Sequence, residues 1–253
     1  MLMNIIDKFF AQLSRILNNL VSKNYKLEHR YQNRNQITNA EFVLNTLKNK
    51  HFNPVNIIDI GCGHGEWTKK LIKFYPKSQY LLFDADKKNT KKLDYFKKKS
   101  LNITYKICLL SNDNNSYKFY NMGYGSSIYK EQTSNKGEAE EVIATTLKKE
   151  LPSSISKYNN NLIKLDVQGS ELKVLDGLAD MIKYFEVIII EVSLHNYNKN
   201  SPLFPDVINY MSNKNFRLYD LFDLKRLGKN GSFLVQFDCI FVRNNSDLLN
   251  VKF

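Results

Sequence analysis

Apolar and polar residues alternate along most of the chain in blocks that predict strands and helices in turn. The first clear block is the apolar run at residues 55–60, rich in β-branched side chains, which is typical of a strand buried on both faces of a parallel sheet. Helix-forming residues follow from Glu66. We expect further strands at about 79–84, 102–108, 117–120, 162–165, 185–192, 216–221 and 233–242. We expect helices at about 40–49, 66–75, 87–98, 142–150, 171–178 and 205–213.

This order of elements predicts the fold class. Alternating strands and helices followed by a terminal pair of strands describe an α/β fold with a doubly wound, mostly parallel sheet and an antiparallel edge. We expect this domain to span residues 36–253. Within it, residues 122–137 carry several Gly and Ser residues and predict a long loop of the kind that covers substrates.

Residues 1–35 are expected to form a separate N-terminal part, an amphipathic helix at about 1–24 and a polar linker. Its apolar positions recur at helical spacing and are Ile5, Phe9, Leu13, Ile16, Leu17 and Leu20. The favoured interpretation is packing on its own domain or on a second subunit in a homodimer. Peripheral attachment to a membrane is the alternative, because Lys8, Arg15 and Lys23 lie on the opposite face.

Composition narrows the class of protein. The chain has 253 residues, of which 43% are hydrophobic and 13% aromatic, which are values of a globular protein. Its 37 basic residues exceed its 25 acidic residues, so the net charge is +12. Nucleic acid, an anionic glycan or an anionic membrane surface would suit that charge. The lysines are scattered, however, and the densest group, residues 87–99, reads as the solvated face of a helix with Leu93 and Phe96 buried. We therefore expect no nucleic-acid partner.

The cysteines point to a reducing compartment. Cys62, Cys108 and Cys239 are far apart and form no C-x-x-C motif, so a disulfide framework or a zinc site is not expected. No apolar run approaches the roughly 18 residues needed to cross a bilayer. Charged residues interrupt the N-terminal segment, which is unlike a secretory signal. We expect a cytoplasmic protein, with membrane-peripheral attachment as the alternative.

A glycine-rich turn after the first core strand predicts a cofactor site. In DIGCGHGEW, Gly61, Gly63 and Gly65 let the backbone turn tightly and approach a ligand, with the next helix N-terminus above it. The spacing G-x-G-x-G, together with Asp84 at the end of the next strand, fits S-adenosylmethionine better than NAD, because such an acid binds the ribose hydroxyls. The candidate cofactor-binding residues are Asp59, Gly61, Cys62, Gly63, Gly65, Glu66, Trp67, Asp84, Ala85, Ser111 and Asp166.

Two later strands bring more polar side chains to the same edge of the sheet. Asp166 ends the strand at 162–165, while Glu191 and His195 end and follow the strand at 185–192. These three residues are the candidate catalytic bases. Asp59 and Glu191 each have a structural alternative, in which Asp59 accepts hydrogen bonds from the glycine turn and Glu191 caps a loop. A lone histidine such as His195 is more often a packed or surface residue.

Three segments resemble the FkbM-type family of S-adenosylmethionine-dependent O-methyltransferases. They are LIKLDVQGSELKVLDGL, VIIIEVSLHNY and VQFDCIFVR, and the resemblance runs from about residue 57 to 243 with its most specific part at 166–177. GSSIYK at 125–130 and TTL at 145–147 are similar to further family segments. The resemblance implies a Rossmann-like class I methyltransferase fold with seven strands and an antiparallel last strand. The family's glycine motif falls on residues 59–65 and its ribose-binding acid on Asp84.

The chain departs from the family pattern at several positions, which are Cys62, Gly63, Asp84, Ala85 and Lys148. The first four are consistent with the same chemistry. At Lys148, relatives usually carry Asp, so any role of that carboxylate is missing here.

The implied reaction is methyl transfer to a hydroxyl group of a sugar, glycan or secondary metabolite. A hydroxyl is a weak nucleophile and needs a base, worth typically 10²–10⁴-fold. Alternatively, Asp166 and Glu191 hold a divalent cation that lowers the hydroxyl pKa, although we assign no metal ligand. Two other functions remain open. One is an inactive methyltransferase-fold protein that binds a partner through residues 1–24, and the other is an NAD-dependent oxidoreductase.

Overall fold

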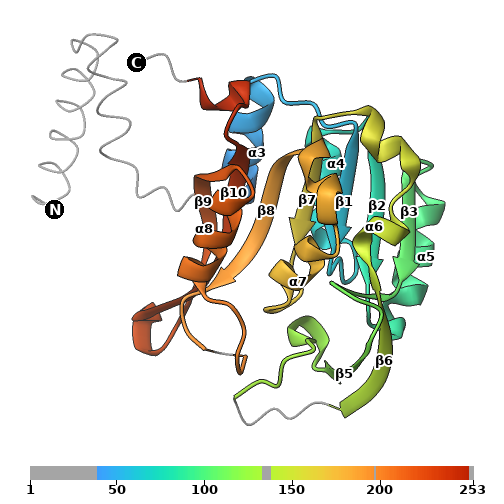
Figure 1. Ribbon diagram of the computed structural model, residues 1–253, viewed down its shortest axis with the longest axis vertical. Helices are drawn as coiled ribbons and strands as arrows, with labels where there is room; N and C mark the ends of the chain where they lie inside the picture. The colour runs from blue at the N-terminus through green and yellow to red at the C-terminus, as the bar shows by residue number, and fades with distance from the viewer. Residues whose placement is uncertain (1–38, 133–137, 197, 251–253) are drawn as a thin grey trace, which may run out of the picture. The chain divides into compact units, whose positions relative to one another are not determined.

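The computed structural model describes residues 39–132, 138–196 and 198–250 (Figure 1). The chain divides into two compact units, Met1–Ile37 and Thr38–Phe253, and the described residues all belong to the second. The helix expected at about 1–24 lies outside the described residues, so its role stays a prediction.

The second unit is built on a seven-stranded sheet in the order β3-β2-β1-β7-β8-β10-β9. Its strands are β1 (Asn56–Ile60), β2 (Gln79–Asp84), β3 (Ile103–Ile107), β7 (Asn161–Leu165), β8 (Phe185–Ser193), β9 (Phe216–Leu227) and β10 (Phe233–Arg243). The first five in spatial order pair in parallel, and β10 pairs antiparallel with both β8 and β9. The doubly wound, mostly parallel sheet with an antiparallel last strand is therefore confirmed. It is the arrangement of class I methyltransferases.

Helices cover both faces of this sheet. They are α3 (Ala40–Asn49), α4 (Glu66–Phe74), α5 (Thr90–Lys98), α6 (Leu147–Glu150), α7 (Glu171–Asp176) and α8 (Phe204–Asn213). Short 3₁₀ turns are η1 (Lys87–Asn89), η2 (Gly123–Gly125), η3 (Ser153–Lys157), η4 (Ala179–Tyr184), η5 (Lys229–Gly231) and η6 (Asp247–Leu249). One apolar core packs α3, α4 and α5 on one face, and a second packs α6, α7 and α8 on the other. Because successive strand residues point to opposite faces, buried strands are apolar at almost every position.

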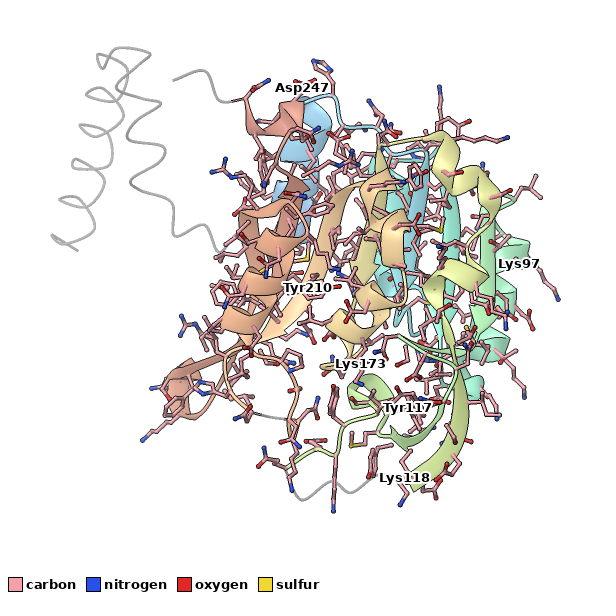
Figure 2. The ribbon with its side chains drawn as sticks, viewed as in Figure 1. Lys97, Tyr117, Lys118, Lys173, Tyr210 and Asp247 are labelled. Atoms are coloured by element: carbon pink, nitrogen blue, oxygen red, sulfur yellow. The ribbon has the colours of Figure 1, made fainter. Side chains whose placement is uncertain are left out.

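The lysine-rich helix α5 behaves as its sequence predicts. Leu93 is buried and Phe96 packs against the same core, whereas the basic residues point outward. Figure 2 shows Lys97 at the outer edge of the domain. This face is a solvated helix surface.

A second, three-stranded sheet was only partly expected. It has the order β4-β6-β5 and consists of β4 (Leu109–Ser111), β5 (Ser116–Asn121) and β6 (Glu138–Thr146). In Figure 1, β5 and β6 lie beyond the carboxyl ends of the main strands. Lys173 of α7 stacks on the ring of Tyr117 in β5, with 5.5 Å between the ammonium and the ring centre, and both are labelled in Figure 2.

The prediction of a helix at 142–150 is wrong over most of that segment. Residues up to Thr146 belong to β6, and only Leu147–Glu150 is helical. Val142 pairs with Tyr117, and Ile143 pairs with Ser116. The β-branched side chains in this segment favour an extended backbone, and pairing with β5 decides between the two structures.

Candidate functional site

The glycine turn that follows β1 is held by its neighbours on both sides. Gly61 and Gly65 adopt left-handed backbone angles, with φ of 73° and 77°. A Cβ atom on Gly61 would lie 1.8 Å from the carbonyl oxygen of Asp166, and one on Gly65 would lie 2.6 Å from the ring of Phe96. Only glycine meets both demands, the backbone angle and the close approach.

The amides of this turn bind the end of β2. The N–H groups of Gly61 and Cys62 donate to the carbonyl of Phe83, at 2.9 and 3.1 Å. The N–H of Gly63 donates to Asp84 Oδ2 at 2.7 Å. All three of these N–H groups are satisfied within the protein. The turn therefore brings the backbone of Gly61 and Gly63 and the side chain of His64 next to the carboxylate of Asp84.

Asp84 is fixed by three donors. Besides Gly63, the N–H of Asp86 and the side-chain amide of Asn89 donate to its Oδ1, at 2.8 and 3.0 Å. Burial raises the pKa of Asp84, while the backbone hydrogen bonds oppose that rise. A carboxylate offers about four acceptor directions. The three donors thus fix the carboxylate and leave one direction for a hydroxyl of a ligand.

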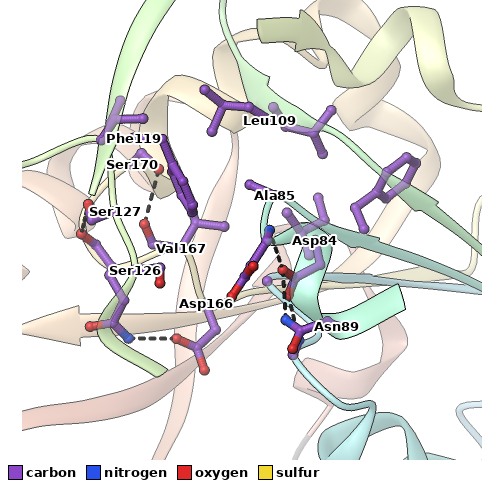
Figure 3. Close-up of a pocket in the computed structure, with 18 of the residues that line it drawn as sticks. Asp84, Ala85, Asn89, Leu109, Phe119, Ser126, Ser127, Asp166, Val167 and Ser170 are labelled. Atoms are coloured by element: carbon purple, nitrogen blue, oxygen red, sulfur yellow. Dashed lines mark hydrogen bonds between the residues drawn. The ribbon is translucent and has the colours of Figure 1, made fainter. Parts of the chain in front are cut away.

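A cavity of about 330 Å³ opens beside Asp84 and Gly63. Its apolar lining includes Ala85, Leu109, Phe119 and Ile128, and its polar lining includes Asp84, Ser126, Ser127, Asp166 and Ser170. Figure 3 shows Asp84 and Asn89 on one side of the cavity and Asp166 on the other. Phe119 belongs to β5, so the small sheet supplies one wall and the large sheet another.

Asp166 forms the polar wall opposite Asp84. Its Oδ2 accepts from Lys164 Nζ at 2.8 Å, and its Oδ1 accepts from the side-chain amide of Gln168 at 2.8 Å. The side chain is 27% exposed and lines the cavity. Burial alone would raise its pKa. The charge and hydrogen bond of Lys164, together with the charge of Lys225 and the hydrogen bond of Gln168, hold the pKa of Asp166 below its ordinary value.

Glu191 lies next to Asp166 and is saturated by donors. The amide of Gln168 bridges the two carboxylates and reaches Glu191 Oε2 at 2.6 Å. Lys225 forms an ion pair with Oε1, and Gln236 donates to Oε2 at 3.2 Å. Burial, together with the charge of Asp166, raises the pKa of Glu191. Glu191 is 5% exposed, so its main contacts are with the protein itself.

Gln168 connects these carboxylates to two loops. Its backbone carbonyl accepts from Ser127 Oγ and from the amide of Asn198, both at 2.8 Å. Its φ is 52°, an uncommon angle for a residue with a side chain. The segment carrying Ser127 and the segment carrying Asn198 therefore meet on one peptide group.

The structure brings together five of the candidate residues at the cavity wall, which are Gly61, Gly63, Asp84, Ala85 and Asp166. The others lie outside its lining. They are Asp59, Cys62, Gly65, Glu66, Trp67, Ser111, Glu191 and His195. Their part in binding or catalysis stays a prediction.

Most of those outer candidates have contacts inside the protein. Asp59 accepts from Thr68 Oγ1 at 2.5 Å, and exposed Glu66 pairs with Lys69 at 2.8 Å. Buried Ser111 donates to the hydroxyl of Tyr117 at 3.1 Å. Cys62 is buried in the core beneath α4, and the ring of Trp67 packs against the same core.

Several site residues were not assigned a role from the sequence, namely Asn89, Phe119, Lys164, Gln168, Lys225 and Asp238. A signal existed for Lys164, because a lysine inside the apolar strand LIKL requires a buried partner. No comparable signal marks Phe119, which reaches the cavity through the pairing of the small sheet.

In the described part of the chain, no group of three or more His, Cys, Asp or Glu side chains is arranged to hold a metal ion. No helix in that part is both long and apolar enough to span a membrane.

A family model, described as the methyltransferase FkbM domain, matches residues 59–218. The chain belongs to the FkbM methyltransferase family. The match begins at the aspartate before the glycine turn and ends within β9. Comparison with curated proteins gave no match for this FkbM methyltransferase.

Solved structures similar to this FkbM methyltransferase are distant in sequence. A Clostridium acetobutylicum S-adenosylmethionine-dependent methyltransferase shares 9% identity, with a TM-score of 0.47, over 88% of this chain and 100% of that one. The Burkholderia thailandensis 1,6-didemethyltoxoflavin-N1-methyltransferase, solved with its substrate and S-adenosylhomocysteine, shares 10% identity, with a TM-score of 0.46, over 93% and 90%. The Geobacter metallireducens precorrin-6y C5,15-methyltransferase shares 9%, with a TM-score of 0.41, over 83% and 93%.

Proposed function

We propose that this FkbM methyltransferase takes S-adenosylmethionine as methyl donor and methylates a hydroxyl group of a sugar, a glycan or a secondary metabolite. The observation that carries the donor assignment is the contact between Gly63 and Asp84, which joins the glycine turn to an acid at the cavity wall. The acceptor is proposed to be a small molecule or glycan and not a nucleic acid.

The residues around the cavity fit an adenosyl group. The remaining acceptor direction of Asp84 suits a ribose hydroxyl. Ala85, Leu109, Phe119 and Ile128 form an apolar slot of the kind that holds a flat ring. Asp166 supplies a negative charge on the opposite wall. When bound, the cofactor supplies an electrophilic methyl group on a positively charged sulfur.

Asp166 is the best-placed of the three candidate bases. Among them it alone lines the cavity, and its low pKa keeps it ionised at neutral pH, ready to accept a hydrogen bond from a hydroxyl. Glu191 is occupied by Gln168, Lys225 and Gln236, and we assign it the role of anchoring Gln168. Exposed His195 lies outside the cavity lining.

A divalent cation between Asp166 and Glu191 is the second option for activating the acceptor. Lysine and glutamine donors already occupy the oxygens that such a cation would take. A cation would have to displace Lys164 and Lys225. We therefore propose proton acceptance by Asp166 without a resident metal.

Calorimetric titration with S-adenosylhomocysteine and with NADH tests the donor assignment. The unaltered chain is expected to bind S-adenosylhomocysteine and not NADH. Asp84→Ala is expected to abolish that binding while circular dichroism stays unchanged. Asp94→Ala, which removes an exposed carboxylate bonded to Tyr105, is the matched control and should bind normally.

Four results would overturn this proposal. Binding that persists in Asp84→Ala would place the ribose elsewhere, and binding of NADH alone would favour an oxidoreductase. Binding of the methyl donor without transfer to any panel of sugars, glycans and phenols would favour the inactive partner-binding protein. Transfer to amines only would contradict the hydroxyl acceptor.

A further inference from the structure

We propose that Lys164 is a positioning residue that keeps Asp166 ionised and oriented at the cavity wall. The role of Asp166 in methyl transfer rests on the proposed function, whereas the effect of Lys164 on Asp166 does not. Lys164 does not line the cavity, so it would act through Asp166.

Strand register puts a set of charges on one face of the sheet. Lys164 of β7 pairs across the sheet with Asp59 of β1, and Glu191 of β8 pairs with Asp238 of β10. Because alternate strand residues share a face, these side chains lie on the face covered by α3, α4 and α5. Trp67 of α4 covers them, with Lys164 Nζ 5.5 Å from its ring centre.

Lys164 is the buried cation of this group. It is 2% exposed and is the one lysine or arginine among the buried residues of the described chain. A buried ammonium is stable only with a close, hydrogen-bonded counter-ion. Four carboxylates surround it, from Asp59, Asp166, Asp238 and Glu191. Other titratable groups that act on this cluster are the thiol of Cys62, the ammonium of Lys225 and the carboxyl group of Glu171, which interacts with Glu191.

Hydrogen bonding decides which carboxylate takes the charge of Lys164. Asp166 receives its hydrogen bond at 2.8 Å. Asp59 is bonded to Thr68 instead, and one side-chain oxygen of Asp59 and one of Asp238 have no partner in the described chain. Burial raises the pKa of both, that of Asp238 to about 7. The cluster thus resolves into two ion pairs, Lys164 with Asp166 and Lys225 with Glu191.

The same contacts orient Asp166. Lys164 holds Oδ2 and Gln168 holds Oδ1, so both oxygens of the carboxylate are fixed. A carboxylate in a partly buried wall would otherwise favour the protonated form. The ammonium group of Lys164 therefore keeps Asp166 ionised at the cavity wall, while Lys164 itself stays outside the cavity lining.

Carbon-13 NMR of aspartate carboxyl groups tests this directly in the full chain, with Asp166→Asn to assign the signal. In the unaltered protein, Asp166 should titrate below its ordinary value. In Lys164→Met its midpoint should rise by about 1–3 pH units, the range found when a carboxylate loses an adjacent cation. Lys164→Arg, which retains the charge, should restore a low midpoint.

A second readout compares S-adenosylmethionine with S-adenosylhomocysteine, which lacks the positive charge. Preference for the charged ligand should fall as Asp166 is protonated, so the pH of that fall should move upward in Lys164→Met together with the NMR midpoint. A purely structural lysine would weaken both ligands equally at every pH.

Three outcomes would overturn the inference. The first is a titration midpoint of Asp166 at or above its ordinary value in the unaltered chain. This measurement needs no variant, so it holds even if Lys164→Met fails to fold. An unchanged midpoint in Lys164→Met, or an equal rise in Lys164→Arg, would show that the charge of Lys164 is not the cause. If the midpoints move as expected but neither ligand binds the unaltered chain, the proposed function fails and the inference stands.

Discussion

A Cβ atom on Gly61 would lie 1.8 Å from the carbonyl oxygen of Asp166. The end of β1 and the end of β7 are thus packed backbone to backbone, and the N–H of Asp166 also donates to the carbonyl of Ile60 at 2.9 Å. This contact fixes Gly61 and Asp166, which both line the cavity, relative to each other.

Gly61→Ala should therefore damage both stability and ligand binding. Its left-handed angle costs about 1–2 kcal/mol for a residue with a side chain, and the clash with Asp166 adds to that cost. We expect a lower thermal unfolding midpoint and a loss of S-adenosylhomocysteine affinity by calorimetry. Gly125→Ala is the control, because its nearest contact would be 3.9 Å away at Met122. Equal behaviour of the two variants would contradict the packing argument.

Phe119 is expected to contribute to affinity through its ring. It is 4% exposed and lines the cavity opposite the main sheet. Phe119→Ala should weaken S-adenosylhomocysteine binding about tenfold, or ~1.4 kcal/mol, and Phe119→Leu should weaken it less. Phe233→Ala, at a ring that is 62% exposed, is the control. An unchanged dissociation constant in Phe119→Ala would remove the proposed ring slot.

Glu171 should make folding stability depend on pH. Burial raises its pKa to about 7, although the N–H groups of Val167 and Gly169 donate to it. The pKa of Glu171 is higher in the folded chain than in the unfolded chain, so its protonated form stabilises the fold. This stabilisation is fully present below about pH 4.5 and is lost as the pH rises to about 7.

Glu171→Gln keeps an acceptor for both amides and removes the titration. We expect the free energy of unfolding, measured with urea, to decrease less between pH 4.5 and 7 in Glu171→Gln than in the unaltered chain. The difference should be on the order of 3 kcal/mol. Asp238 and Glu191 titrate in both proteins, and the charge of Glu191 also acts on Glu171, so the difference between the two curves reports mainly on Glu171. Glu41→Gln, at an exposed position, is the control, and parallel curves for Glu171→Gln and the unaltered chain would contradict a raised pKa of Glu171.

Gln168 is expected to matter for turnover more than for donor binding. Its amide bridges Asp166 and Glu191, so Gln168→Ala leaves two carboxylates without their shared donor. The loss of a hydrogen bond to a buried charged group costs about 1.5–3 kcal/mol. We expect a lower unfolding midpoint and a reduced methyl transfer rate, with S-adenosylhomocysteine affinity within a few-fold of normal. Gln79→Ala, at an exposed position in β2, is the control. A variant with full turnover would show that the bridge is dispensable.

Much of the main sheet could be predicted from the sequence because the information is local. Apolar runs identified the strands, and the glycine spacing identified the turn between β1 and α4. The small sheet could not be predicted in the same way, since β6 depends on pairing with β5, whose paired residues lie 17 to 27 positions earlier in the chain. An apolar pattern at 142–150 is compatible with either a helix or a strand until that partner is known.

The residues of the candidate site also differ in whether the local sequence predicts their position. Asp84 and Asp166 were predictable because each ends an apolar strand at the carboxyl edge of the sheet. The placement of Glu191 behind Gln168 and of Trp67 over Lys164 follows from side-chain packing, which has no signature in a single sequence. Lys164 shows the difference most clearly, because its strand position was predictable and its partner was not.

The separate hydrogen-bonding of the two sheets has an evolutionary consequence. Phe119 and Ile128 reach the cavity from the segment between β4 and β7, whereas Gly63 and Asp84 reach it from the main sheet. Insertions or exchanges in that segment can reshape one side of the cavity, including the proposed ring slot, without altering the contact between Gly63 and Asp84. Relatives with different β5–β6 segments would then differ in the shape of this side of the cavity while retaining the Gly63–Asp84 contact.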